Sequence, residues 1–67
     1  MEAIQITNPR GQTKYYQGDI LDVPVSTIFK EFARRLDKVD EETLEKVKRF
    51  NPHCTITIIE LPKRRKR

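Results

Sequence analysis

The amino-acid sequence predicts a small α+β domain of the order β-β-α-β, with a three-stranded sheet and helix on one face. Three observations lead to this prediction. Apolar and polar residues alternate near the start of the chain, apolar residues recur at helical spacing in its middle, and a β-branched segment lies near its end. A chain of 67 residues is expected to form one domain with one small core, over residues 1–61. Residues 62–67 then form a basic C-terminal tail.

The first two strands are expected to form a hairpin. Residues 3–7 alternate with period two, which places Ile4 and Ile6 on one face of the first strand. Residues 8–11, Asn-Pro-Arg-Gly, suit a type I turn, because Asn favours its first position, Pro its second and Gly its fourth. The second strand follows from residue 12 to residue 17 or 20.

Glycine and proline divide the next part of the chain. Residues 18–19, Gly-Asp, indicate a bend or bulge in the second strand. Residues 21–25 are expected to form a connector, because Pro24 lacks the N–H group that a strand ladder or a helix interior would use. Ser26 or Thr27 is a suitable N-cap for a following helix.

Residues 27–50 are expected to form one long helix or two shorter ones. The apolar residues of this segment stay on one side of a helix, within about 90° of a common stripe. They are Ile28, Phe29, Phe32, Leu36, Val39, Leu44, Val47 and Phe50. A break at residues 38–40 fits equally well, because Asp37 and Asp40 can each cap a second helix.

The strongest predicted strand covers residues 53–61. Asn51 precedes Pro52, which ends the helix because the residue before a proline avoids the α region. Residues 55–59 are all β-branched, which favours a strand and suggests a central place in the sheet. Alternation puts one set of side chains on each face, Cys54, Ile56 and Ile58 against Thr55, Thr57 and Ile59.

The sheet face opposite the helix is expected to be bare and weakly apolar. Its members would be Gln5, Thr13, Tyr15, Thr55, Thr57 and Ile59. Tyr15, Thr55, Thr57 and Ile59 form a candidate interaction face, which a second copy of the chain or another protein would cover. Tyr15 can also stack on a base, although the aromatic-rich signature of RNA-recognition domains is absent from the sequence.

The positive charge of the chain is concentrated at its end. The net charge is +4, from 14 basic and 10 acidic residues, and five of the basic residues are Lys63, Arg64, Arg65, Lys66 and Arg67. The other 62 residues therefore hold nine basic and ten acidic residues, a net charge of −1. Five adjacent like charges cannot pack, so we expect a flexible, disordered tail. It is expected to contact phosphates of DNA or RNA without reading base sequence.

The helical segment is not expected to add a basic surface. Its basic residues, including Arg34 and Arg35, share an exposed arc with several acidic residues. Pairs such as Glu31 with Arg35 stand four residues apart, where they stabilise a solvated helix. The segment should therefore present an ordinary charged helix surface.

The tail has two other interpretations. Residues 62–67, Pro-Lys-Arg-Arg-Lys-Arg, resemble a short, single-cluster nuclear localisation signal, which implies nuclear import in a host with a nucleus. A role in solubility alone is the remaining alternative. We otherwise expect a cytoplasmic protein without a membrane partner, because the chain has one cysteine, no signal-like start and no apolar run of roughly 20 residues.

No catalytic, cofactor or metal site is predicted. His53 and Cys54 are the only histidine and cysteine, whereas zinc needs about four ligands. Their side chains point to opposite faces of a strand, so they cannot form a catalytic pair. Two hypotheses follow, neither an enzyme nor a binder of a small-molecule substrate. One is a nucleic-acid-binding accessory protein, and the other is a protein-interaction or regulatory module, which either forms a homodimer or binds another macromolecule.

Overall fold

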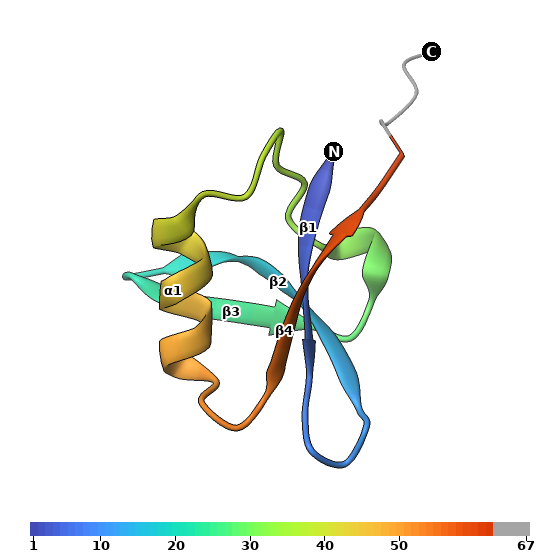
Figure 1. Ribbon diagram of the computed structural model, residues 1–67. Helices are drawn as coiled ribbons and strands as arrows, with labels where there is room; N and C mark the ends of the chain where they lie inside the picture. The colour runs from blue at the N-terminus through green and yellow to red at the C-terminus, as the bar shows by residue number, and fades with distance from the viewer. Residues whose placement is uncertain (63–67) are drawn as a thin grey trace.

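The computed structural model describes residues 1–62, and residues 63–67 lie outside the described part of the chain. The elements are strands β1 (Glu2–Thr7), β2 (Thr13–Ile20) and β3 (Val23–Thr27), the 3-10 turn η1 (Lys30–Phe32), helix α1 (Glu41–Phe50) and strand β4 (Thr55–Glu60), as Figure 1 shows. The strands form one antiparallel sheet of the order β3-β2-β1-β4. The α+β class is confirmed, but the sheet has four strands instead of three. The expectation of a flexible tail lies outside the described residues.

The first hairpin forms as predicted. The Asn8 side chain accepts hydrogen bonds from the backbone N–H groups of Arg10 and Gln12, at 3.0 and 2.9 Å. The Gly11 N–H group donates to the Asn8 carbonyl oxygen at 2.9 Å, which closes the turn. Gly11 has a φ of 87°, a conformation that glycine adopts without strain. Local turn chemistry therefore determines this part of the fold.

The prediction that residues 21–25 form a connector is wrong, because β3 occupies most of this segment. β3 lies at the edge of the sheet, where Pro24 is tolerated since one side of an edge strand has no ladder to interrupt. Leu21 and Asp22 form the β2–β3 turn, and their φ angles are positive, 52° and 64°, as a type I′ turn requires. The second strand does contain an irregularity, but it lies one residue before the predicted Gly18-Asp19 position: the register shifts between Tyr16 and Gly18, whereas Gly18 and Asp19 are themselves paired.

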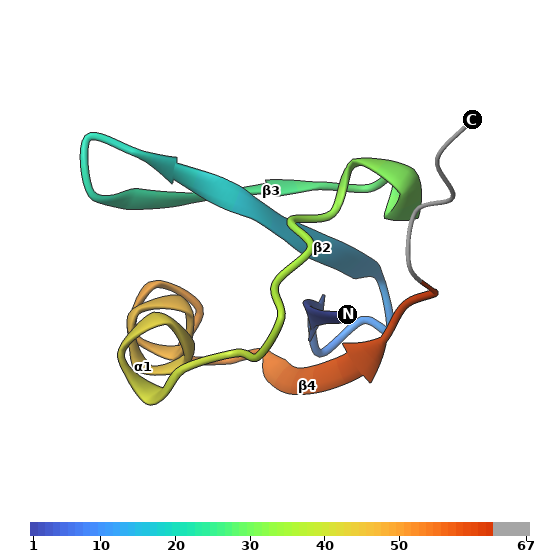
Figure 2. The ribbon, with the colours of Figure 1, turned by 90° about the horizontal axis from the view of Figure 1, so that it is seen from above.

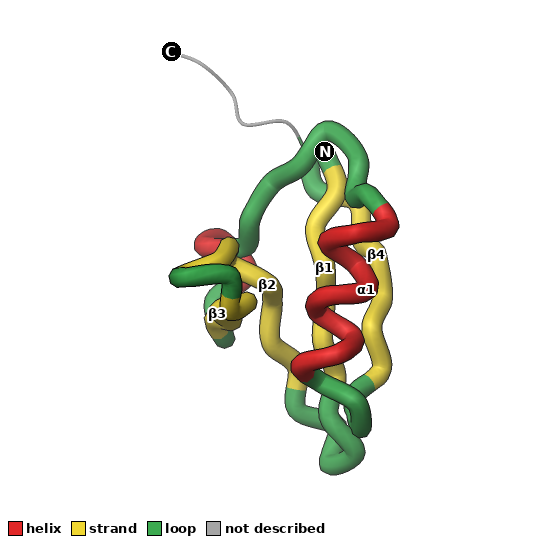
Figure 3. The backbone as a smooth tube through the Cα atoms, turned by 90° about the vertical axis from the view of Figure 1, so that its left-hand side faces the viewer, coloured by secondary structure: helices red, strands yellow, loops and turns green. Residues whose placement is uncertain are grey.

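The long helix over residues 27–50 is also wrong, since residues 28–39 contain η1, one isolated bridge at Leu36 and otherwise bends and irregular backbone. Their backbone pairs with distant strands instead. Glu2 and Leu36 exchange two hydrogen bonds, of 2.7 and 2.9 Å, and the Arg34 N–H group donates to the Tyr16 carbonyl oxygen at 2.8 Å. Figure 3 shows that the β2–β3 hairpin diverges from the β1–β4 pair. Long-range pairing therefore replaces helical hydrogen bonds.

Helix α1 matches the second of the two shorter helices in the alternative prediction. It begins after Asp40, whose carboxylate accepts a hydrogen bond from the Thr43 N–H group at 2.7 Å. This N-cap was one of the two predicted, and it lowers the pKa of the Asp40 carboxyl, chiefly through the hydrogen bond from the Thr43 backbone. The helix ends at Phe50, as the Asn51-Pro52 pair predicts.

The main core lies between α1 and the sheet. Figure 2 shows α1 in the angle between the β2–β3 hairpin and the β1–β4 pair. The buried residues are Ile4, Ile6, Tyr16, Val39 and Val47, and the partly buried Leu36, Leu44, Cys54 and Ile56 pack against them. The predicted faces of β1 and β4 are therefore correct. The central position suggested for β4 is wrong, because β4 forms the other edge of the sheet.

Candidate nucleic-acid interface

The candidate interaction face is assembled as the alternation predicts. Gln5 of β1 lies opposite Tyr15 on one side and Thr57 on the other, so these side chains share one face of the sheet. Thr55 and Thr57 are exposed. Tyr15 and Ile59 instead pack against a second, smaller cluster formed by Ala3, Ala33 and Leu61. The face is thus partly covered at one end, and Thr55 and Thr57 are the exposed members of the candidate interaction face.

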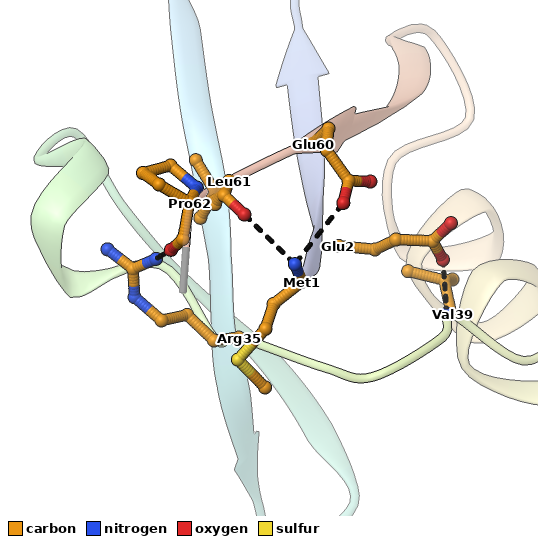
Figure 4. Close-up of polar contacts among 7 residues, drawn as sticks. All are labelled: Met1, Glu2, Arg35, Val39, Glu60, Leu61 and Pro62. Carbon is orange, nitrogen blue, oxygen red and sulfur yellow. Dashed lines mark hydrogen bonds and ion pairs between the residues drawn. The ribbon is translucent and has the colours of Figure 1, made fainter. Parts of the chain in front are cut away.

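The five basic residues Lys63, Arg64, Arg65, Lys66 and Arg67 lie outside the described residues, but the point where they begin is described. The Leu61 N–H group donates to the Met1 carbonyl oxygen at 2.6 Å, and the Met1 amino group donates to the Leu61 carbonyl oxygen at 2.9 Å. The same amino group is 3.2 Å from a Glu60 carboxylate oxygen, as Figure 4 shows. The β1–β4 pairing therefore continues to residue 61.

Arg35 holds the residue that precedes the basic run. Its Nη1 donates to the Pro62 carbonyl oxygen at 2.8 Å (Figure 4). Its Nε is buried and has no hydrogen-bond partner among residues 1–62. A shallow depression lined by Lys30, Glu31, Arg35, Leu61 and Pro62 lies at the same place. Pro62 therefore lies against residues 30–35.

Residues 29–35, Phe-Lys-Glu-Phe-Ala-Arg-Arg, form a segment that we call the aromatic–basic segment. The Phe29 and Phe32 rings contact edge to face, with centroids 5.8 Å apart and an interplanar angle of 81°. Phe29 is 52% exposed and Phe32 is 58% exposed, which is unusual for phenylalanine. Ala33, at 6%, is buried in the small cluster and attaches the segment to the sheet.

Sequence reasoning missed this pair of rings as a surface feature. Helical spacing placed Phe29 and Phe32 with Leu36 and Val39 on one buried stripe. In the structure only Leu36 and Val39 join the main core, because the backbone of residues 28–39 is not helical. The signal that was available is compositional, since aromatic and basic residues alternate closely in the aromatic–basic segment.

A separate polar cluster joins α1 to the β2–β3 hairpin. The Tyr16 hydroxyl donates to Asp19 at 2.6 Å, and the Lys46 ammonium donates to the other Asp19 oxygen at 2.9 Å. Burial raises the pKa of Tyr16 to about 12, aided by the hydrogen bond to Asp19. Hydrogen bonds from Tyr16 and then Lys46 lower the pKa of the Asp19 carboxyl, and the bond to Asp19 raises the pKa of Lys46. These groups satisfy one another, so we interpret the cluster as structural.

The described part of the chain, residues 1–62, contains no group of three or more metal-ligating side chains that could hold an ion. Cys54 packs beside the main core, and His53 is exposed. No helix within this range is long and apolar enough to cross a bilayer. Comparisons of the chain with protein-family models, with curated proteins and with solved structures found no match.

Proposed function

We propose that this chain is a small, non-enzymatic accessory protein that binds nucleic acid, with residues 63–67 contacting phosphates. The observation that carries the proposal is the division of charge. Residues 63–67 carry +5, whereas residues 1–62 carry nine basic and ten acidic residues, or −1. Phosphate contacts provide affinity that does not depend on base sequence, so DNA and RNA of any sequence are expected to bind.

The position of Pro62 supports this proposal. Arg35 binds the Pro62 carbonyl oxygen, and Lys30 lines the same depression, so basic side chains of the body lie where the basic run begins. The cations of α1 differ in this respect. Lys46 is bound to Asp19. Lys48 and Arg49 stand three and four residues after Glu45, which is the spacing of ion pairs on a solvated helix.

Fluorescence anisotropy with labelled oligonucleotides tests the proposal. The full chain is compared with a chain that ends at Pro62, which keeps every described residue. Five phosphate contacts give a slope of log affinity against log salt of roughly −4.5 on duplex DNA and roughly −3.5 on a single strand. Removing residues 63–67 should lower affinity by orders of magnitude and flatten both slopes.

The matched control removes two exposed cations from α1. Lys48→Gln combined with Arg49→Gln lowers the net charge by two but leaves residues 63–67 intact. This variant should keep most of the affinity and a slope close to that of the full chain. A chain ending at Pro62 that binds as tightly as the full chain would show that the proposal is wrong.

A second proposal, contact with a protein, is favoured by the position of β4. Within residues 1–62, β4 pairs only with β1, so its other edge is available to a strand of a second copy or another protein. Thr57→Lys is the suitable test, because Thr57 is exposed whereas Ile59 packs against the small cluster. We expect the full chain to sediment as a dimer and the variant as a monomer. A monomeric full chain would contradict self-association.

A further inference from the structure

We propose that Phe29 and Phe32 form a stacking platform for unpaired bases, so that the protein prefers single-stranded nucleic acid to duplex. This inference rests on the proposed function and names its substrate class. It adds a second part to the binding site, located on the described body of the protein. Three observations support it: the exposure of the rings, their mutual geometry and the charges around them.

The geometry of the ring pair leaves aromatic faces available. In an edge-to-face contact, the ring that presents its edge keeps both of its faces clear of the other ring. The second ring keeps one face clear. Phe29 and Phe32 contact in this way, at an interplanar angle of 81°, and more than half of each side chain is exposed. Bases stack on such faces without regard to sequence, because every base has a π-face.

The charges around the rings favour a polyanion over a protein. The aromatic–basic segment contains Lys30, Arg34 and Arg35 against a single acid, Glu31, a net charge of +2 over seven residues. Arg34 and Arg35 line a second open depression together with Phe32. The buried centre of a protein–protein contact is depleted of charged residues, whereas single-stranded nucleic acid sites combine aromatic rings with cations.

The contact between Arg35 and Pro62 connects the platform to the basic run. This bond, and the depression that Pro62 shares with Lys30, Glu31 and Arg35, place Pro62 beside the aromatic–basic segment. One strand can therefore place its bases on the rings while its phosphates meet the cations. A duplex cannot use the rings in this way, because its bases are stacked inside and only their edges are accessible.

The test measures affinity for an oligothymidylate and for a duplex of equal length at one salt concentration, using the full chain and three variants. Phe32→Leu keeps apolar bulk but removes the aromatic ring, and Phe32→Trp restores a ring. Phe50→Ala is the matched control, since Phe50 is 49% exposed at the end of α1, across the molecule from η1 in Figure 1. Far-UV circular dichroism verifies that each variant is folded.

We expect Phe32→Leu to weaken single-strand binding roughly 5- to 150-fold and duplex binding less than about twofold. Phe32→Trp and Phe50→Ala should bind the single strand like the full chain. If Phe32→Leu binds the single strand unchanged while removal of residues 63–67 abolishes binding, the platform is refuted and the proposed function stands. A change in sedimentation without a change in single-strand affinity would instead assign the rings to a protein contact and refute the platform.

Discussion

The substitution Tyr16→Phe tests the polar cluster that joins α1 to the β2–β3 hairpin. Tyr16 is 5% exposed, and its hydroxyl donates to an Asp19 carboxylate oxygen at 2.6 Å. Burial, followed by the hydrogen bond and the charge of Asp19, raises the pKa of Tyr16 from 10.0 to about 12. The folded state therefore favours the neutral phenol more strongly than the unfolded state does.

The direction of the pH dependence follows from this difference. Between pH 10 and pH 12 the unfolded chain loses the Tyr16 proton while the folded chain keeps it, so the free energy of unfolding falls as pH rises. The stability contributed by the protonated Tyr16 hydroxyl is fully present below pH 10. It decreases by up to about 1.4 kcal/mol per pH unit between pH 10 and pH 12. Between about pH 9 and pH 11, the free energy of unfolding of the unmodified protein should fall by about 1.3 kcal/mol more than that of Tyr16→Phe.

Urea unfolding followed by far-UV circular dichroism measures this difference at the two pH values. Tyr15→Phe is the control, because it removes a neighbouring tyrosine on the other sheet face but keeps the Tyr16 hydroxyl. It should retain the pH dependence of the unmodified protein. Equal pH dependence in the unmodified protein and Tyr16→Phe would refute the reasoning, as would a tyrosinate absorbance change showing that Tyr16 ionises near pH 10.

Two further predictions concern the core and the helix. Ile4→Ala should lower the free energy of unfolding by about 2–5 kcal/mol, because Ile4 is completely buried. Its cross-strand partner Ile58 is 42% exposed, so Ile58→Ala should cost less than half as much in the same urea titration; equal losses would contradict the assigned core. Asp40→Ala should reduce the helical signal and the Tm, whereas Asp40→Asn keeps a capping oxygen and should reduce them less. The stability contributed by the Asp40 carboxylate is present above pH 3.8 and is lost as pH falls through the lowered pKa of that carboxyl. Measuring Tm at a series of acid pH values tests this.

The parts of the fold that the sequence predicts are those with local causes. Asn8 and Gly11 make their turn through contacts within five residues of the chain, and Gly18 comes directly after the register shift of β2. Asp40 caps α1 through a residue three positions away. Side-chain alternation also assigns the faces of β1 and β4 correctly, because the period of a strand does not depend on its neighbours.

The errors arise where distant pairing decides the conformation. Residues 28–39 have helical spacing, yet Ala33 and Leu36 pack in different clusters and the backbone pairs with Glu2 and Tyr16. No local signal reveals such partners. Pro24 argues against a central strand but not against an edge strand, a distinction that requires the strand order. Similarly, a run of β-branched residues predicts a strand without fixing its place in the sheet.

For the same reason, the sequence predicts only one of the two parts of the candidate site. The basic run at residues 63–67 is evident from charge alone, whereas the exposure of Phe29 and Phe32 depends on a backbone conformation that their spacing does not indicate. Tyr15 and Ile59 were assigned to the correct face. Their partial burial follows from the path of residues 28–39, which was predicted as helix.

The hydrogen bond from Arg35 to Pro62 has a consequence for the strength of binding. The bond places Pro62 beside the aromatic–basic segment, and five residues of chain span at most about 17 Å. Two weak contacts joined over so short a span act at a high effective concentration, because the second contact forms within one complex. Under the two proposals, a strand that has met either contact is captured by the other before it diffuses away. On these proposals, the two contacts together bind a strand more tightly than either contact would alone.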